Sequence, residues 1–223
     1  MSKDDILFFL GEVVGGKVPE EEKAKFLKNF TLDKVKAEDV AVFAEFMEAK
    51  MPHKLNMPGA IDICGTGGSG LERINTSTIA TFILAELGVP MAKHGNKAAS
   101  GRFGSFDLLE ELGLDIDKSA EELEKIFDKK GLAFIYARKF HPVMKHFASV
   151  RKAVGEPTIF NILGPLLNPA NPQKQIIGTS FKDQMRMIAE ACKLMGKEHV
   201  MVVRGNDGLD EVTMTGLTKV VEM

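Results

Sequence analysis

A short apolar stretch that runs directly into a glycine-rich loop constrains the fold of this chain more than any other feature. Residues 60–64 (AIDIC) predict a strand, and residues 65–70 (GTGGSG) follow it without a break. Glycine at four of these six positions lets successive N–H groups converge on an anion. A helix predicted from Ser77 to about Leu87 would add its N-terminal amides. Taken alone, the loop is equally compatible with a plain turn, and it lacks the lysine of a P-loop.

Strands and helices alternate along much of the remaining chain. The apolar pattern predicts further strands at 89–93, 131–137 and 199–203, and helices at 105–112, 119–129 and 182–195. Pro90 restricts the first of these strands to pairing at its start or at an edge. Such alternation is typical of a mostly parallel sheet with helices on both faces, so the predicted fold class is α/β.

The first fifty residues differ, because their apolar residues recur at helical spacing. Helices are predicted from Ser2 or Asp4 to about 14, from 19 to about 30, from Thr31, and from 37 to 50. Further helical pieces at 142–147, 149–154 and 158–163 interrupt the later strand–helix alternation. The chain therefore combines a small helical unit with an α/β unit.

Two other loops follow predicted strands and carry polar side chains suited to phosphate or metal. The segment 93–101 (KHGNKAASG) offers a cation, an imidazole and an amide, and 104–107 (GSFD) starts another helix. The segment 205–211 (GNDGLDE) carries adjacent carboxylates that can share a hard cation. Taken alone, the segment 93–101 is as typical of a solvated loop as of an anion site. An adjacent acidic pair such as that in 205–211 is more often plain surface charge. Because ligands gather at the carboxyl ends of strands in open α/β sheets, we expect the three loops to meet.

Composition narrows the classes of protein. Lysine and arginine total 29 against 31 acidic residues, a net charge of −2, which argues against nucleic acid or an anionic membrane as partner. Cys64 and Cys192 lack metal-ligand spacing and are expected to be free buried thiols of a reducing compartment. No apolar run reaches the length of a bilayer span, and the N-terminus is unlike a signal peptide, so we expect a cytoplasmic protein.

The order of short motifs along the chain resembles that of the anthranilate phosphoribosyltransferases, glycosyltransferases with a nucleoside phosphorylase-like fold. The motifs are GTGGSG at 65–70, NTST at 75–78, KHGN at 93–96, GSFD at 104–107, HPVMKHFASVR at 141–151, TIFNILGPLLNP at 158–169 and GNDGLDE at 205–211. The match extends from about residue 8 to residue 223. The KHGN motif favours this family over the related pyrimidine nucleoside phosphorylases.

The resemblance implies a division of the chain into two domains. The helical domain would comprise residues 1–57, with 141–166 packing back onto it. The α/β domain would comprise 58–140 and 167–223. The resemblance also implies a homodimer formed through the helical domain.

The resemblance further implies transfer of the phosphoribosyl group of phosphoribosyl pyrophosphate (PRPP) to the amine of anthranilate, which releases pyrophosphate, in tryptophan biosynthesis. No general base is assigned, because an aromatic amine is nucleophilic without prior deprotonation. The implied PRPP-binding residues are Gly65, Gly68, Ser69, Asn75, Thr76, Ser77, Thr78, Lys93, His94, Gly95, Asn96 and Ser105. The implied anthranilate-binding residues are Gly65, Asn96, His141 and Arg151, and the implied ligands of two magnesium ions are Ser77, Asp210 and Glu211.

Three departures from the family pattern stand against this match. Ser69 replaces the usual acidic residue of the glycine loop, and Phe106 replaces a usually small residue, where it either packs in the core or narrows the PRPP site. Family members also usually have an extra helix before Asp4 and continue well beyond Met223. This implies a large domain that is incomplete at its C-terminus, as in a gene fragment or a minimal homologue with a covering partner.

Two alternative functions remain open at this point. One is a transferase for another aromatic acceptor, which the presence of Asn96 and Arg151 disfavours. The other is a non-catalytic homologue that binds PRPP, which Ser69 and the short chain favour.

Overall fold

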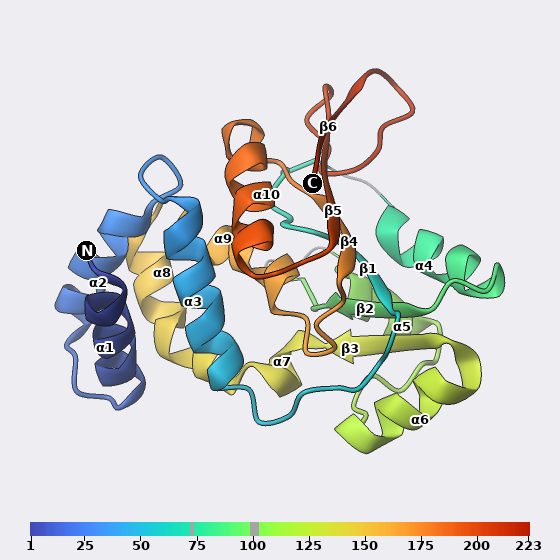
Figure 1. Cartoon of the computed structure of the whole chain (residues 1–223), viewed down its shortest axis with the longest axis horizontal. Helices are drawn as coiled ribbons and strands as arrows, with labels where there is room; N and C mark the ends of the chain where they lie inside the picture. The colour runs from blue at the N-terminus through green and yellow to red at the C-terminus, as the bar shows by residue number, and fades with distance from the viewer. Residues whose placement is uncertain (72–73, 99–102) are drawn as a thin grey trace.

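The computed structural model describes residues 1–71, 74–98 and 103–223 and centres on a six-stranded sheet of order β3-β2-β1-β4-β5-β6 (Figure 1). The strands are β1 (Ile61–Gly65), β2 (Met91–Gly95), β3 (Leu132–Tyr136), β4 (Lys174–Gly178), β5 (His199–Gly205) and β6 (Thr218–Glu222). Neighbouring strands pair in parallel, except that β6 pairs antiparallel with β5. The predicted α/β class with a mostly parallel sheet is confirmed.

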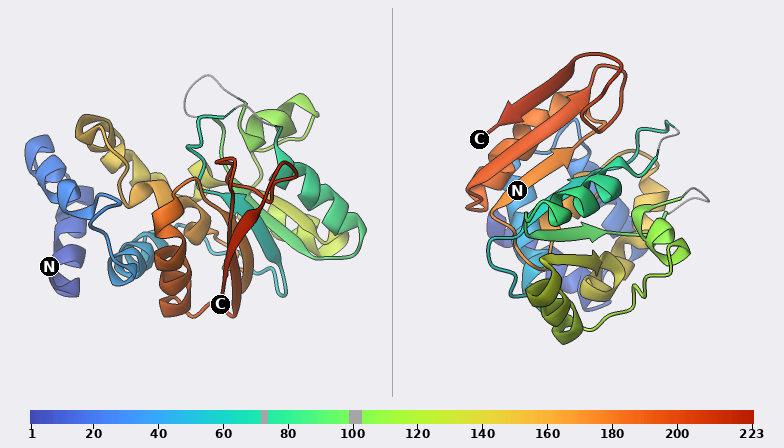
Figure 2. Two further views of the ribbon diagram at one scale, coloured as in Figure 1. Left: turned by 90° about the horizontal axis from the view of Figure 1, so that it is seen from above. Right: turned by 90° about the vertical axis from the view of Figure 1, so that its right-hand side faces the viewer.

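Helices cover both sides of this sheet, as Figures 1 and 2 show for α4 and α10. α4 (Thr76–Glu86) packs on β1 and β2, and α6 (Ala120–Lys130) packs on β3. α10 (Met185–Leu194) packs on β5, where Val200 and Val202 join it in one hydrophobic cluster. The remaining sheet-side helices are α5 (Ser105–Glu111), α7 (Ala137–Phe140) and the 3-10 turn η4 (Lys182–Gln184).

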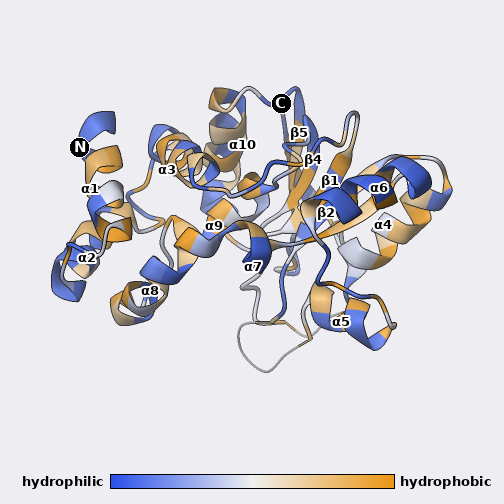
Figure 3. Ribbon diagram, turned by 90° about the horizontal axis from the view of Figure 1, so that it is seen from below, coloured by the Kyte–Doolittle hydropathy of each residue, from blue (hydrophilic) through white to orange (hydrophobic). Residues whose placement is uncertain are grey.

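The N-terminal helices form a layer beside the sheet (Figure 1). They are α1 (Lys3–Val14), α2 (Glu20–Leu27), the 3-10 turn η1 (Lys28–Phe30) and α3 (Ala37–Ala49). Four later segments pack on them: η2 (Pro142–Phe147), α8 (Ala148–Val154), α9 (Phe160–Leu163) and η3 (Gly164–Leu167). Figure 3 shows hydrophobic residues dominating α9, which lies between the two layers. One continuous hydrophobic cluster therefore joins residues from both ends of the chain.

Local sequence signals explain most of these boundaries. Ser2 caps α1 through a capping box with Asp5, and Ser119 caps α6 in the same way with Glu122. Gly131 ends α6 with a φ of 65°, the left-handed conformation that glycine adopts without strain.

Two sequence predictions need correction, and one strand was not predicted. No helix begins at Thr31, because this residue pairs with Thr158 in an isolated antiparallel bridge that ties the two helical segments together. The strand predicted at 89–93 instead spans Met91–Gly95, since Pro90 has no N–H to donate and contributes only its carbonyl, to Ile61. β4 was missed altogether, because its sequence KQIIG has only two apolar residues.

Phe106 and the cysteines occupy buried positions. Phe106 is fully buried and stacks on Tyr136 with ring centroids 5.2 Å apart, so it packs in the core. Cys64 and Cys192 are free and buried, as expected. Burial raises the pKa of the Cys64 thiol and raises that of Cys192 to about 12, which makes thiolate chemistry unfavourable at both. None of the helices in the described residues is long and apolar enough to cross a membrane.

Phe43 is the centre of the helical core, where its ring contacts those of Phe26, Phe30 and Phe160. We expect Phe43→Ala to lower the free energy of unfolding by about 3–5 kcal/mol, because it removes a fully buried ring and leaves a cavity. Urea unfolding followed by circular dichroism measures this. Phe8→Ala is the matched control, since Phe8 is 72% exposed. Equal losses in the two variants would contradict the assignment of this core.

Candidate active site

The carboxyl ends of the parallel strands lie along one edge of the sheet. β1, β2, β4 and β5 all end in glycine, at Gly65, Gly95, Gly178 and Gly205. Because these residues have no side chains, the loops that follow can fold back close to the strand ends. The predicted glycine loop, lysine loop and acidic loop leave β1, β2 and β5 at this edge. Residues 99–101 of the lysine loop lie outside the described residues.

Asp210 of the acidic loop lies against the glycine loop. Its Oδ2 accepts a hydrogen bond of 3.1 Å from the N–H of Gly67, and a Cβ on Gly65 would lie 2.6 Å from the same oxygen. The backbone carbonyl of Asp210 occupies the space that a Cβ on Gly178 would need. Glycine at the ends of β1 and β4 therefore lets a carboxylate that is 1% exposed reach the glycine loop, with Glu211 next to it.

Lys93 links β2 to the start of α4. Its ammonium donates hydrogen bonds to the carbonyl of Ile63 at 2.6 Å and to Oγ of Ser77 at 3.1 Å. The side chain is only 2% exposed, so a cation is held beneath the amides that begin α4. Ile63 lies two residues before Gly65 on β1, so Lys93 ties the start of α4 to the strand that leads into the glycine loop.

The remaining residues of the first site segment surround the same helix start. Asn75 is the N-cap of α4 and its amide reaches the carbonyl of Gly104 at 3.5 Å. Thr76 is the first helical residue, and Thr78 is fully buried with a hydroxyl that has no hydrogen-bond partner within the described residues. In the glycine loop, Ser69 accepts a bond of 3.4 Å from the N–H of Leu71. Gly68 has a φ of 81°, which favours glycine there.

The lysine loop is held by the start of α5. One Asp107 oxygen accepts bonds of 2.8 Å from the N–H groups of Ala98 and Gly104. Ser105 donates to the carbonyl of Asn96 at 3.3 Å and fills the space beside Gly95. Asn96 itself is exposed, so its side chain is accessible to a ligand.

His94 and His141 form a buried pair that joins the sheet to the helical layer. Their Nε2 atoms are 3.3 Å apart, and Nδ1 of His94 lies 3.2 Å from the carbonyl of Gly164. A carbonyl only accepts, so we assign the His94 proton to Nδ1, and Nε2–H of His141 then donates to Nε2 of His94. Lys93 and His94 are consecutive on β2 and therefore point to opposite faces of the sheet.

Burial keeps both imidazoles neutral. It lowers the pKa of His94 to about 3, with the nearby His141 adding to the effect and the Gly164 carbonyl opposing it. Burial likewise lowers the pKa of His141 to about 4, opposed by the Leu167 carbonyl. The pair is therefore an uncharged hydrogen-bonding unit near neutral pH.

Asp62 is a buried site residue that sequence reasoning missed. It accepts hydrogen bonds from the N–H of His94 at 3.3 Å and from Nδ2 of Asn168 at 2.9 Å. Burial raises the pKa of this carboxyl, while Lys93 and then Asn168 oppose the change. An aspartate within an otherwise apolar strand was the available signal, because a buried carboxylate needs partners.

The loop after β4 was also missed, because β4 itself was. Ser180 donates to the carbonyl of Gly67 at 2.9 Å, and Thr179 lies 3.4 Å from the Thr66 hydroxyl. These two hydroxyls therefore connect the loop after β4 to the glycine loop. The signal was the small polar pair that follows KQIIG.

Arg151 lies on α8, in the helical layer. Its guanidinium packs over the ring of Phe160 at 5.5 Å, and burial lowers its pKa. Within the described part of the chain, no hydrogen bond or ion pair joins it to Asn96 or His141. A half-buried guanidinium of this kind is suited to pairing with a carboxylate ligand.

The predicted metal ligands offer oxygen atoms only, which suits a hard cation such as Mg²⁺. Among the described residues, no group of three or more His, Cys, Asp or Glu side chains could hold a metal alone. Asp210, Glu211 and Ser77 would therefore have to share an ion with phosphate oxygens and water, which is the usual manner of magnesium binding. The close approach of Asp210 to Gly65 brings one of these carboxylates to the glycine loop, where such phosphate oxygens would be bound.

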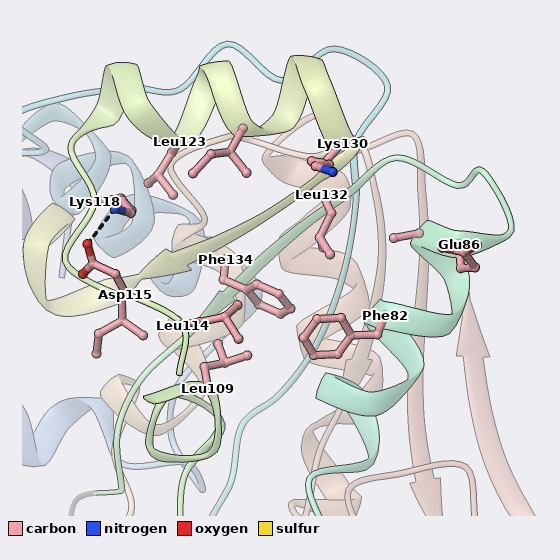
Figure 4. Close-up of a pocket in the computed structure, with 13 residues that line it drawn as sticks. Phe82, Glu86, Leu109, Leu114, Asp115, Lys118, Leu123, Lys130, Leu132 and Phe134 are labelled. Carbon is pink, nitrogen blue, oxygen red and sulfur yellow. Dashed lines mark hydrogen bonds and ion pairs between the residues drawn. The ribbon is translucent and has the colours of Figure 1, made fainter. Parts of the chain in front are cut away.

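A separate cavity of about 300 Å³ lies between α4, α6 and β3 (Figure 4). Phe82, Leu123, Leu132 and Phe134 form much of its wall, and a Lys118–Asp115 ion pair of 2.6 Å borders it. None of the predicted site residues lines this cavity. The candidate active site is therefore defined by the loops at the strand ends.

Residues 57–223, which contain the whole sheet and the three loops at its carboxyl edge, match the glycosyl transferase family, a/b domain. The fold and the site therefore define a protein of the glycosyl transferase class. An anthranilate phosphoribosyltransferase of Bacillus caldotenax is 37% identical over the full chain, which covers 92% of that relative. The chain belongs to the anthranilate phosphoribosyltransferase family.

Other relatives are longer. The chain is 39% identical to the Novosphingobium aromaticivorans enzyme over 95% of its own length but spans only 64% of that protein. The crystal structure of the Thermus thermophilus enzyme superposes with a TM-score of 0.91 at 35% identity, covering all of this chain and 67% of the other. The Saccharomyces cerevisiae enzyme in complex with PRPP and Mg has a TM-score of 0.86 at 30% identity, with coverages of 99% and 66%.

The buried histidine pair predicts a loss of stability in mild acid. Each imidazole titrates near pH 6.5 when unfolded but only near 3–4 in the fold, so the unfolded chain binds more protons below pH 6.5. Stability is then full above that value and falls by roughly 1.4 kcal/mol per pH unit for each histidine as pH decreases. We expect the free energy of unfolding, measured with urea between about pH 7 and pH 4.5, to fall less steeply with decreasing pH in the double variant His94→Asn/His141→Asn than in the wild type. A slope equal to that of the wild type would rule this account out.

Proposed function

We propose that this chain transfers the phosphoribosyl group of PRPP to the amine of anthranilate and releases pyrophosphate. The observation that carries the proposal is the contact of Asp210 with the glycine loop, because it puts a carboxylate where pyrophosphate and a metal would meet. Membership of the family supports the same reaction. We place this reaction in tryptophan biosynthesis.

The phosphate groups would be held by two sets of donors. The glycine loop from Gly65 to Gly70 offers backbone amides, and the N-terminus of α4 offers amides with the hydroxyls of Ser77 and Thr78. Lys93 adds a buried positive charge. The lysine loop, with His94, Asn96 and Ser105, would contact the side of the ligand opposite the glycine loop. A ligand with phosphates at both ends of a ribose suits this arrangement.

We propose two Mg²⁺ ions bound through Ser77, Asp210 and Glu211. Support comes from the oxygen-only donor set and from the Mg in yeast enzyme structures. Neutralisation of the leaving pyrophosphate is the chemistry that bound metal would supply.

Arg151, Asn96 and His141 are proposed to bind anthranilate, with the guanidinium of Arg151 facing its carboxylate. A yeast relative has been solved in complex with 4-fluoroanthranilate, which supports an acceptor of this class. As the amine nitrogen bonds to ribose C1′, the bond from C1′ to the pyrophosphate oxygen breaks, and the amine proton leaves afterwards. The protein acts mainly by aligning the two substrates.

Further proposals concern the setting of the reaction. Two buried free thiols support a reducing, cytoplasmic compartment. A homodimer through the helical domain is proposed as well, on the family resemblance alone. We also propose the division into a helical domain of residues 1–57 with 141–166 and an α/β domain, because α8 and α9 pack on α2 and α3.

Turnover can be followed directly by the loss of anthranilate fluorescence when the protein is mixed with PRPP and Mg²⁺. Calorimetric titration with PRPP and Mg²⁺ supplies the independent measurement of binding. Absence of both turnover and PRPP binding would refute the proposal. Binding without turnover would favour a non-catalytic homologue or another aromatic acceptor.

Lys93 should be required for PRPP binding rather than for folding alone. We expect Lys93→Met to raise the dissociation constant of PRPP by about 10- to 100-fold, since it removes a charged donor beneath the phosphate site. Lys197→Met is the matched control, because Lys197 is also buried but bonds to Asn171 and Pro172, which precede β4 at the opposite, amino ends of the strands. Similar PRPP affinities for the two variants would contradict the role of Lys93.

Ser69 should set the magnesium requirement. Ser69→Asp restores the carboxylate usual in the family, so we expect half-saturation at a Mg²⁺ concentration lower by roughly 3- to 10-fold, because ligand charge tunes metal affinity. Ser69→Asn controls for size without charge. Identical magnesium profiles for the wild type and Ser69→Asp would count against a metal near this loop.

A further inference from the structure

Asp207 lies in the acidic loop, three residues before Asp210, and has no role in the proposed reaction. Its Oδ1 accepts a hydrogen bond of 3.1 Å from the N–H of Leu209. Its Oδ2 accepts bonds from the hydroxyls of Thr213 and, at 2.6 Å, Thr215. Both oxygens of this exposed carboxylate are therefore engaged within the loop.

These bonds enclose the acidic pair. Leu209 immediately precedes Asp210, and Thr213 lies two residues after Glu211, so one carboxylate bridges the two sides of the segment. Both sides are anchored to strands. The N–H of Gly205 donates to the carbonyl of Leu209 at 2.9 Å, and the N–H of Thr213 donates to Thr218, the first residue of β6.

The enclosed segment has little room to move without losing its contacts. The carbonyl of Asp210 fills the space at Gly178 and its carboxylate reaches the N–H of Gly67. A shift of the segment would separate that carboxylate from the glycine loop. Hydrogen bonds from Thr213 and then Thr215 lower the pKa of Asp207, so it remains an ionised acceptor across the neutral range.

We propose that Asp207 is a positioning residue that holds Asp210 and Glu211 at the glycine loop without binding metal or substrate itself. The proposal deepens the proposed function and rests on it for its magnesium readout. Its structural readout is independent of activity.

The experiment compares Asp207→Ala with Thr213→Val/Thr215→Val, which removes the two hydroxyl hydrogen bonds from the donor side but leaves the charge and the bond from the N–H of Leu209 in place. Hydrogen exchange of residues 206–213 reports the order of the loop. Magnesium titrations at saturating PRPP report the metal requirement. We expect the backbone amides of residues 206–213 to exchange about tenfold faster in both variants than in the wild type. We expect the Mg²⁺ concentration at half-saturation to rise by roughly 10-fold, as for other hydrogen-bonding partners of metal ligands.

Asp115→Ala is the matched control, because Asp115 is exposed and accepts from the N–H of Asp117 in the same local pattern, but lies in the separate loop between α5 and α6. We expect Thr213→Ser to keep the hydrogen exchange and magnesium dependence of the wild type, since serine retains the hydroxyl that donates to Asp207. A magnesium effect in Asp207→Ala that the threonine variant lacks would make Asp207 a ligand and overturn the proposal. Unchanged exchange in both variants would also overturn it. Failure of the proposed function would appear instead as no turnover and no PRPP binding by the unmodified chain.

Discussion

The approach of Asp210 to the glycine residues at the ends of β1 and β4 is the contact on which the site depends. It requires Gly65 and Gly178 to lack side chains, since a Cβ on either would collide with the aspartate. It also requires β1, β4 and β5 to be neighbours in that order, because their carboxyl ends then share one edge. The glycine loop becomes a two-sided site only through this contact, with amides from one loop and a carboxylate from another.

The second organising contact joins the sheet to the helical layer. His94 ends β2, and its ring meets His141 and the carbonyl of Gly164, both from segments that pack on the N-terminal helices. Asp62 and Asn168 add bonds behind it. Because these hydrogen bonds are buried, they restrict the position of the sheet relative to the helical segments. Within the described residues, Nδ1 of His141 is the atom of this group that has no hydrogen-bond partner.

Much of the architecture could be predicted from local signals. Ser119 marked the start of α6, and Ser2 was one of two predicted starts for α1. The alternation of predicted strands and helices indicated the mostly parallel sheet. The errors arose where tertiary context outweighed local pattern. Thr31 resembles a helix cap but pairs with Thr158 across the helical layer, and β4 is stabilised as an inner strand of the sheet despite its weak apolar pattern.

The sequence by itself determined the chemistry available: glycine loop amides, a lysine, hydroxyls and adjacent carboxylates, each directly after a strand. Residue identity and spacing are enough for that, because the functional groups are properties of single side chains and of backbone freedom. Only the tertiary structure decided which groups meet. Contacts between Asp210 and Gly67, between Lys93 and Ser77, and between the two histidines join residues far apart in the chain. Strand order and the close approach at glycine, rather than any local pattern, bring them together.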